Sequence, residues 1–277
     1  MKNISSIFSD SSSKSPLVMG ILNMTPDSFS DGGKYVDFKT AQIHAERMLE
    51  DGVDIIDIGG ESTRPGSSAV PMNEELKRVI PTLKWITDSY DIPVSIDTRK
   101  AEVAEAALDA GASIINDVSG FSEDMTRLIA SSGAKAVLMH SLWDPGIMQK
   151  KVQPDTYSNI IPDIISWAEQ RISVAEDIGV KRSQLIFDPG IGFGKLTSHN
   201  LEIVKRCAEL KSLGLPVLIG ASRKNFIGEL TKKSPSERLG GSLAVVAAVY
   251  GCADIVRVHD VSETIDLIKI LDALREY

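Results

Sequence analysis

Short apolar runs alternate with longer amphipathic stretches along the chain. Eight runs are rich in Val, Ile and Leu and almost continuously apolar, which is typical of parallel strands whose two faces are both covered. These runs are residues 17–24, 54–60, 93–98, 113–119, 135–140, 185–190, 216–222 and 254–260. The pattern therefore predicts eight β-strands separated by helices.

The stretches between the runs have the period of amphipathic helices. In two clear cases, residues 41–51 and 101–110, a glycine follows at once, Gly52 and Gly111, and such a glycine is a usual helix stop. Eight β-α repeats in 277 residues predict an α/β protein with a closed (β/α)8 TIM barrel. An open doubly wound sheet is the alternative. That fold would be expected to have a glycine-rich fingerprint directly after the first strand, but this chain has NMTPDS there.

The repeats contain no linker-like segment, so we expect one barrel domain over residues 16–277. Residues 1–15 are polar and Ser-rich, and we expect them to form a mobile tail or a lid across the bottom of the barrel. Two connections, residues 25–34 and 61–72, are long and rich in Gly, Pro, Ser, Thr and Asp, which favours loops.

Composition narrows the class of protein. Apolar residues make up 43% and charged residues 25%, as in ordinary globular proteins. No run is apolar for long enough to span a membrane, and because residues 1–15 have no apolar stretch we do not expect them to act as a secretory signal. The net charge of −8 disfavours nucleic-acid and anionic-membrane partners. Cys207 and Cys252 lie far apart in the sequence, and we expect both to be reduced thiols in a cytoplasmic protein.

A polar residue ends each of the eight apolar runs. These residues are Asn23, Asp57, Asp97, Asn116, His140, Asp188, Ser222 and His259. A single such residue is usually a helix cap or a turn former. In a barrel, however, the carboxyl ends of all strands meet at one mouth, where barrel enzymes have their active sites. Eight polar residues there favour function over capping.

One subset of these residues favours anion binding. Arg257 and His259 alternate with Val256 and Val258, which predicts that both basic side chains point to one side of the last strand, into the lumen. Ser222, Arg223 and Lys224 end the seventh strand, and the loops after strands seven and eight are the usual phosphate site of this fold. Arg64 in the second loop is a further candidate. Surface ion pairs are the plain alternative for a lone arginine.

A second subset suits a flat heterocycle. Asp97, Asn116, Asp188 and Lys224 together offer carboxylate acceptors, an amide and an ammonium. Such groups are costly to bury without partners, and a ring with adjacent N–H donors and a carbonyl would satisfy them. The alternative is an internal network in which Asp pairs with Lys or Arg. The glycine-rich run DPGIGFGK (188–195) is a weak signal alone, and we expect it to bring Phe193 and Lys195 close to the mouth on a flexible backbone.

Seven segments resemble, in the same order, the motifs of the dihydropteroate synthase family, over nearly the whole chain. They are GILNMTPDSFSDGG (20–33), IDIGGESTRPG (56–66), SIDTRK (95–100), INDVSG (115–120), DPGIGFGK (188–195), GASRKNFIG (220–228) and VRVHDV (256–261). The family transfers the pterin-methyl group of 6-hydroxymethyl-7,8-dihydropterin pyrophosphate to p-aminobenzoate, which gives dihydropteroate and pyrophosphate. Its members are usually homodimers, and sulfonamides occupy their aminobenzoate pocket.

The resemblance implies a role for each matching residue. The residues implied for pterin binding are Asp97, Asn116, Met139, Asp188, Gly220 and Lys224. Those implied for pyrophosphate are Asn23, acting through Mg²⁺, with Thr63, Arg64, Arg257 and His259. Those implied for p-aminobenzoate are Phe29, Thr63, Arg64, Pro65, Phe193, Ser222 and Lys224. The implied catalytic set is Asp97, Asp188, Lys224, Arg64 and Asp31.

The chemistry of the residues agrees with this activity. Pyrophosphate leaves readily once a magnesium ion and basic groups neutralise its charge. The cation left on the exocyclic methylene is stabilised electrostatically by carboxylates such as Asp97 and Asp188. A neutral aryl amine needs little activation, which explains why no nucleophile–base pair stands out. We therefore expect a dissociative substitution, with both long loops closing to exclude water.

One segment departs from the family pattern. After the fifth strand the family usually has MHM followed by a glycine-containing turn, whereas this chain reads MHSLWDP (139–145). Met139, which would pack on the pterin, is retained. The effect of Ser141 and Trp143 on access to the site stays open.

Two other functions remain open. A related barrel that transfers a methyl group from a folate to a corrinoid protein would share Asp97, Asn116 and Asp188, but it needs no pyrophosphate site. A non-catalytic pterin carrier would tolerate loss of Arg64 or of the first loop. The intact loop motifs at 20–33 and 56–66 favour the synthase over both. The helical stretch 243–251 is apolar enough for a dimer interface or for packing on the barrel.

Overall fold

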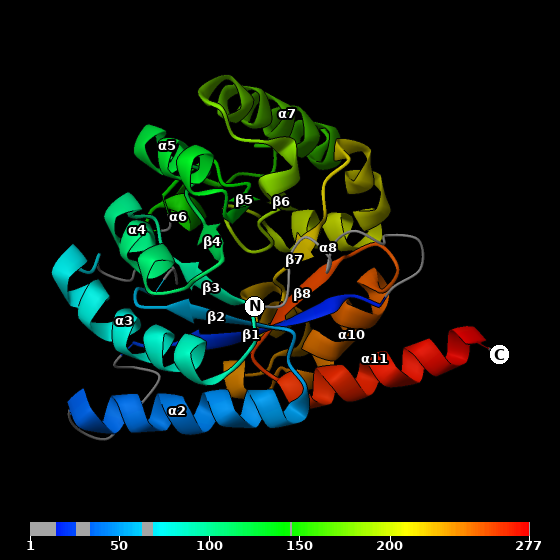
Figure 1. Cartoon of the computed structure of the whole chain (residues 1–277). Helices are drawn as coiled ribbons and strands as arrows, with labels where there is room; N and C mark the ends of the chain where they lie inside the picture. The colour runs from blue at the N-terminus through cyan, green and yellow to red at the C-terminus, as the bar shows by residue number, and fades with distance from the viewer. Residues whose placement is uncertain (1–14, 26–33, 63–68, 145, 277) are drawn as a thin grey trace.

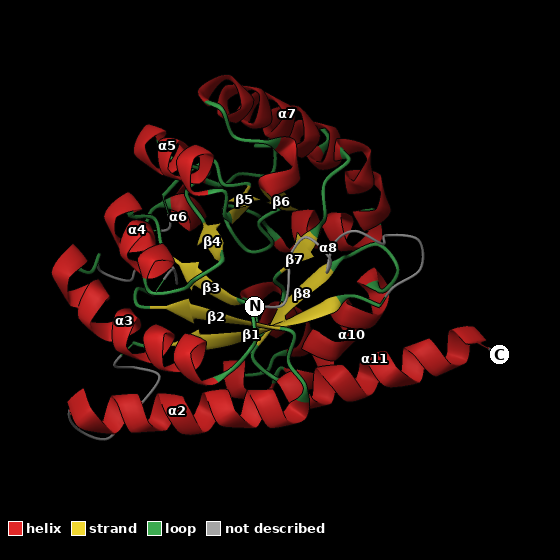
Figure 2. Ribbon diagram, in the orientation of Figure 1, coloured by secondary structure: helices red, strands yellow, loops and turns green. Residues whose placement is uncertain are grey.

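The computed structural model describes residues 15–25, 34–62, 69–144 and 146–276. In this part of the chain eight parallel strands form a barrel (Figures 1 and 2). The strands are β1 (Leu17–Asn23), β2 (Ile55–Gly59), β3 (Val94–Asp97), β4 (Ile114–Asp117), β5 (Lys135–Met139), β6 (Leu185–Asp188), β7 (Leu218–Ile219) and β8 (Ile255–Val258). All eight predicted strands are confirmed, and so is the TIM-barrel fold.

The barrel closes between β6 and β7. Hydrogen bonding follows the order β6-β5-β4-β3-β2-β1-β8-β7, and a parallel bridge between Phe187 and Val217 joins β6 to β7. The N–H of Phe187 donates to the carbonyl of Pro216 at 2.8 Å. β7 has two residues instead of the seven expected, because the ladder ends where the chain turns into the site at Gly220.

Helices surround the barrel in the expected alternation. They are α2 (Lys34–Asp51), α3 (Met72–Ser89), α4 (Ala101–Asp109), α5 (Glu123–Ser132), α6 (Met148–Lys151), α7 (Ile160–Ile178), α8 (Thr197–Lys205), α9 (Asn225–Thr231), α10 (Leu239–Val249) and α11 (Val261–Glu276), with 3-10 turns at Arg182–Gln184, Cys207–Leu213 and Pro235–Glu237. Gly52 and Gly111 follow their helices with φ of +94° and +104°, so both predicted stops are confirmed.

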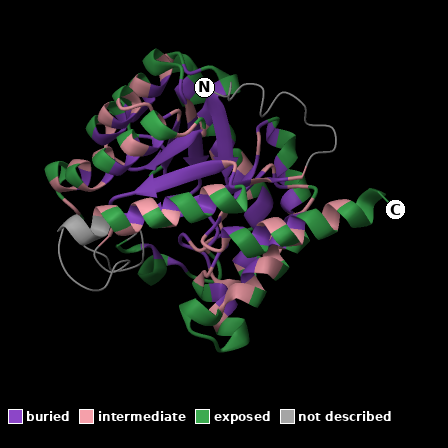
Figure 3. Ribbon diagram, turned by 60° about the horizontal axis from the view of Figure 1, so that its bottom comes forward, coloured by how far each residue is buried: buried purple, intermediate pink, exposed green. Residues whose placement is uncertain are grey.

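The strands of the barrel are mostly buried (Figure 3). The core has two parts, one on each face of the sheet. A large cluster packs between the strands and the helices. A smaller layer fills the barrel interior with one side chain from each of seven strands: Met19, Ile55, Ile114, Val137, Ile186, Leu218 and Ile255. Both faces of every strand are therefore buried, which explains the continuous apolar runs.

Several smaller expectations can be compared with the described residues. Cys207 and Cys252 form no disulfide. Across these residues, no helix is both long and apolar enough to cross a membrane. α10 buries Val246 and Val249 against the barrel and exposes Ala247. The division into a tail of residues 1–15 and a barrel stays a prediction, because 1–14 lie outside the described residues.

Candidate active site

The polar end of the barrel follows from the two-residue period of the strands. The residue two positions after each member of the apolar interior layer points to the same side of its strand, one step closer to the carboxyl end. These residues are Ile21, Asp57, Asn116, Met139, Asp188, Gly220 and Arg257. Asp97 joins them because it pairs with Asn116 and with Gly59 in the ladder. The predicted mouth is thus a polar layer directly above an apolar plug.

Asp57 and Arg257 tie this layer together across the barrel. The fully buried Asp57 carboxylate accepts from Arg257 Nε at 2.6 Å and from Asn116 Nδ2 at 3.1 Å. Arg257 Nη2 donates to Asp97 Oδ2 at 2.7 Å. The second Asp57 oxygen, Oδ1, has no hydrogen-bond partner among the described residues. One guanidinium therefore bridges two carboxylates, and the Asn116 amide has its nitrogen turned toward Asp57.

Asp188 and Lys224 interact through their charges at the same end of the barrel. The N–H of Gly190 donates to Asp188 Oδ1 at 2.7 Å. The other carboxylate oxygen, Oδ2, faces Gly220, where an added Cβ would lie 3.9 Å from it. Lys224 Nζ lies 4.1 Å from the centre of the Phe193 ring, within the range of a cation–π contact. The structure thus brings the four predicted heterocycle-binding residues to one end of the barrel.

Burial shapes the ionisation of this end. Burial raises the pKa of Asp97 to about 7, although the Arg257 guanidinium beside it acts in the opposite direction. Burial also raises the pKa of Asp188, against the Gly190 N–H and the Lys224 ammonium. It lowers the pKa of Lys224 to about 8, while the Asp188 carboxylate opposes the change. Carboxylates and an ammonium with pKa values shifted toward neutrality are typical of a functional site.

The predicted anion-binding residues are only partly as expected. Arg257 lies in the lumen but is bound to Asp57 and Asp97, so the two predicted subsets form one network. Arg223 forms an ion pair with Asp260. His259 Nδ1 lies 3.0 Å from Ser222 Oγ, and burial, with Arg257 and Arg223 nearby, lowers the His259 pKa to about 3. His259 is therefore a neutral hydrogen-bonding group at neutral pH.

Asn23 lies where β1 ends, next to the carboxylates. It pairs with Gly59, and a Cβ built on Gly59 would lie 3.6 Å from Asn23 Oδ1 and 3.5 Å from Asp97 Cβ. The side chains of Asn23 and Asp97 thus both border the space above Gly59. Among the described residues, no three His, Cys, Asp or Glu side chains are grouped to hold a metal.

Five of the predicted site residues lie outside the described residues. They are Phe29, Asp31, Thr63, Arg64 and Pro65. Their assignments remain predictions.

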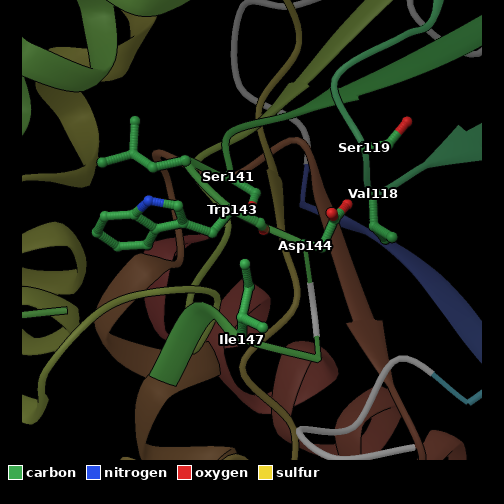
Figure 4. A pocket seen from close by; sticks show the side chains of 7 residues that line it. Val118, Ser119, Ser141, Trp143, Asp144 and Ile147 are labelled. Atoms are coloured by element: carbon green, nitrogen blue, oxygen red, sulfur yellow. The ribbon is translucent and has the colours of Figure 1, made fainter. Parts of the chain in front are cut away.

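The departure at residues 141–144 borders a cavity of about 280 Å³ at the ends of β4 and β5. Figure 4 shows Val118 and Ser119 opposite Trp143 and Ile147 in this cavity. Ser141 Oγ donates to the carbonyl of Trp143 at 2.7 Å, which makes the turn compact. Trp143 also packs on the small cluster of Val118, Met139, Met148 and Phe193. The unusual turn therefore adjoins both a predicted pterin residue and a predicted aminobenzoate residue.

Three residues differ from their expected use. The sequence assigned no binding role to Asp57, yet its carboxylate accepts hydrogen bonds from Asn116 and Arg257. Lys195 is only 3% exposed, and its ammonium contacts His140 and the Phe193 carbonyl rather than opening to the mouth. His140 follows Met139, so it points to the helix side of β5, where it packs on Trp167. The period of two would have indicated the directions of Asp57 and His140, but no local signal indicates that Lys195 turns inward.

Known proteins match nearly the whole chain. Residues 19–259 match the family of pterin binding enzymes. The dihydropteroate synthase of Clostridium beijerinckii is 44% identical over 261 residues, 93% of each chain. The structure of Yersinia pestis dihydropteroate synthase in complex with a sulfonamide drug has a TM-score of 0.88 and 41% identity, over 95% of both chains. That of the Xanthomonas albilineans enzyme with 4-aminobenzoic acid has a TM-score of 0.87 and 42% identity, over 95% of this chain and 94% of that one.

Proposed function

The chain belongs to the dihydropteroate synthase family of pterin-binding enzymes, and on this premise we propose that its polar barrel end condenses 6-hydroxymethyl-7,8-dihydropterin pyrophosphate with p-aminobenzoate. The products are 7,8-dihydropteroate and pyrophosphate, in folate biosynthesis. The convergence of Asp97, Asn116, Asp188 and Lys224 above the apolar plug carries the proposal. The full-length match to named synthases favours it over a methyl transfer to corrinoid or a carrier function.

The pterin ring suits the free hydrogen-bonding atoms of this layer. Asp188 Oδ1 is engaged by the Gly190 N–H, so Oδ2 is the oxygen left for ring N–H groups. The Asn116 nitrogen donates to Asp57, which leaves the amide oxygen as an acceptor toward the ligand. Lys224 supplies a donor for the ring carbonyl, with Met139 and Gly220 as the flat walls. This pattern selects a ring with adjacent donors and one carbonyl.

The pyrophosphate is held at the rim by Asn23, Arg257 and His259, with Thr63 and Arg64 from the second loop. Arg257 keeps a positive charge here, because Asp57 and Asp97 raise its pKa even though burial opposes this. His259, being neutral, contributes an N–H rather than a charge.

A magnesium ion fits this arrangement as an ion carried with the substrate. Mg²⁺ commonly binds one or two protein oxygens together with phosphate oxygens and waters. The Asn23 amide oxygen, which borders Gly59, is such a donor, and the described residues offer no complete cage of acidic or histidine ligands. When bound, the ion neutralises charge on the leaving pyrophosphate.

The reaction is a dissociative substitution. The bond between the exocyclic methylene carbon and the pyrophosphate oxygen breaks, and the carbon then bonds to the aryl amine nitrogen, which loses one proton. The carboxylates of Asp97 and Asp188 stabilise the cation between these steps without forming a bond. Lys224 holds the ring, and Arg64 and Asp31 complete the closed assembly.

The aminobenzoate pocket lies on the Phe193 side of the mouth. Phe193 and Lys224 form one wall through their cation–π contact, and Ser222 lies next to His259. Phe29, Thr63, Arg64 and Pro65 complete the pocket, which is also where a sulfonamide would bind. The structure of the Xanthomonas albilineans enzyme with 4-aminobenzoic acid supports p-aminobenzoate as a ligand of this chain. We also propose a cytoplasmic homodimer.

An activity assay tests the proposal. The protein is incubated with the pterin pyrophosphate, Mg²⁺ and p-aminobenzoate, and released pyrophosphate is measured, with each component omitted in turn. Release that depends on all three is expected. Methyl transfer from a methyl folate to cobalamin without pyrophosphate release would indicate the corrinoid function, and pterin binding without turnover would indicate a carrier.

A further inference from the structure

The glycine-rich turn after β6 is held by side chains from the β5–α7 connection. Gln149 Nε2 donates to the carbonyl of Gly192 at 2.6 Å, and the Tyr157 hydroxyl donates to that of Gly194 at 3.2 Å. Trp143 packs on Gly194, where an added Cβ would lie 3.1 Å from the indole ring. The connection that departs from the family pattern therefore sets the shape of this turn.

Lys195 is the most buried member of this arrangement. Its Nζ lies 2.9 Å from His140 Nδ1, 3.0 Å from the carbonyl of Phe193 and 3.3 Å from the carbonyl of His140. As an ammonium, Lys195 has three protons for these three acceptors. As an amine it keeps two N–H groups for the two carbonyls and can accept from Nδ1–H. In both states it ties the Phe193 backbone to the end of β5.

His140 is itself fixed between aromatic rings. Its ring centre lies 4.8 Å from that of Trp167 on α7 and 5.9 Å from that of Tyr157. His140 is 1% exposed and Lys195 is 3% exposed. The pair is thus anchored to the helix layer of the barrel.

A purely structural role would not favour a lysine here. Burying an amino group costs free energy, and an apolar side chain of similar shape is often as stabilising or more so. Among the described residues, no carboxylate hydrogen-bonds to Lys195. The amino group instead orients the backbone: it binds the Phe193 carbonyl and so fixes the position of the Phe193 ring, which contacts Lys224 Nζ.

We propose that Lys195, held by His140, is a positioning residue for the aminobenzoate side of the site. It keeps the Phe193 ring against Lys224, so that the second substrate meets a preformed wall. The inference rests on the proposed function, in which Phe193 lines the aminobenzoate pocket. Asp97 and Asn116 lie on β3 and β4, away from Lys195, whereas Asp188 ends β6 just before the turn and interacts with the Lys195 ammonium through its charge alone. We therefore expect loss of Lys195 to affect p-aminobenzoate far more than the pterin.

Kinetics of Lys195→Met test this role, because Met keeps the length of the side chain and removes its N–H groups. We expect the KM for p-aminobenzoate to rise about tenfold or more, in line with the loss of buried hydrogen bonds, while kcat and the calorimetric Kd for the pterin stay within about threefold. The matched control is Lys205→Met at the exposed end of α8, which should change nothing. Wild-type protein without turnover would refute the proposed function rather than this inference.

A double-mutant cycle with Phe193→Ala shows whether Lys195 acts through Phe193. We expect Lys195→Met to add less than about twofold to KM in the Phe193→Ala background, because coupled residues are not additive. If Lys195→Met does not fold, Tyr157→Phe removes one bond to the same turn, and we expect a KM about threefold higher that is likewise lost in that background. An unchanged KM, an equal loss of pterin affinity, or full additivity would overturn the proposal.

Discussion

Replacing Asp188 by Asn tests the pterin assignment with almost no change in shape. The Gly190 N–H, 2.7 Å from Oδ1, requires an acceptor at that position. An asparagine must therefore put its oxygen there and its NH₂ group at the Oδ2 position, which faces Gly220 and the lumen. The variant presents two donors where the ligand also presents donors, so at least one buried pair is mismatched.

The magnitude follows from that mismatch. An unsatisfied buried donor costs about 1–3 kcal/mol, and loss of a charge-assisted bond adds to this, so we expect about 2–4 kcal/mol of lost binding. At about 1.4 kcal/mol per tenfold, the pterin Kd should rise roughly 30- to 700-fold. The barrel should stay folded, because the apolar layer below Asp188 is untouched.

Calorimetry with a pterin and circular dichroism measure the two quantities separately. Asp124→Asn, at an exposed position on α5, is the control for the loss of one carboxylate. A pterin Kd within threefold of the wild-type value in folded Asp188→Asn would mean that Asp188 does not bind the pterin.

Three further outcomes are expected. Deleting residues 1–15 should leave kcat/KM within about threefold, because Ser15 bonds to Asp272 on α11 near the start of β1, away from the mouth; a tenfold loss in folded protein would show that the tail reaches the site. p-Aminobenzoate alone should give no heat in calorimetry, and it should bind once pterin, Mg²⁺ and pyrophosphate are present, because Arg64 is assigned to both the pyrophosphate and the aminobenzoate pocket. Arg64→Ala should weaken the binding of p-aminobenzoate more than that of the pterin. Micromolar binding of p-aminobenzoate to the free protein would contradict this order of binding. The kcat/KM for the pterin pyrophosphate should rise through about pH 7 as Asp97 loses its proton and fall above about pH 8 as Lys224 loses its proton. In Lys224→Arg the alkaline fall should move above about pH 9, because arginine keeps its proton. An alkaline fall at the same pH in this variant would mean that another group causes it.

The strands and the polar barrel end were predictable because both depend on local periodicity. A strand buried on two faces is apolar throughout, and the residues at its carboxyl end must meet those of its neighbours. The position of Asp97, Asn116 and Asp188 at one end of the barrel could therefore be predicted from the order of residues alone, while their binding of a heterocycle stays a prediction. The short β7 could not, because the chain leaves the ladder at Gly220 without a change in composition.

Local sequence patterns could not predict which side chains pair with each other across the barrel. Arg257 and Asp57 are 200 positions apart, and only the closed barrel puts the guanidinium between Asp57 and Asp97. The sequence left open both an arginine for pyrophosphate and an internal Asp–Arg network; the structure shows the network, and the pyrophosphate role of Arg257 stays a prediction. Lys195 is a similar case, since its inward turn depends on the distant His140 and Tyr157.

The ratio of the two products tests the central claim most directly. If this barrel end joins the pterin to p-aminobenzoate, each pyrophosphate released must be matched by one 7,8-dihydropteroate. We expect a ratio of about one across limiting amounts of either substrate, with both products lost together in Asp188→Asn. Pyrophosphate release without dihydropteroate would mean that water, not the aryl amine, takes the pterin cation, and would contradict the account.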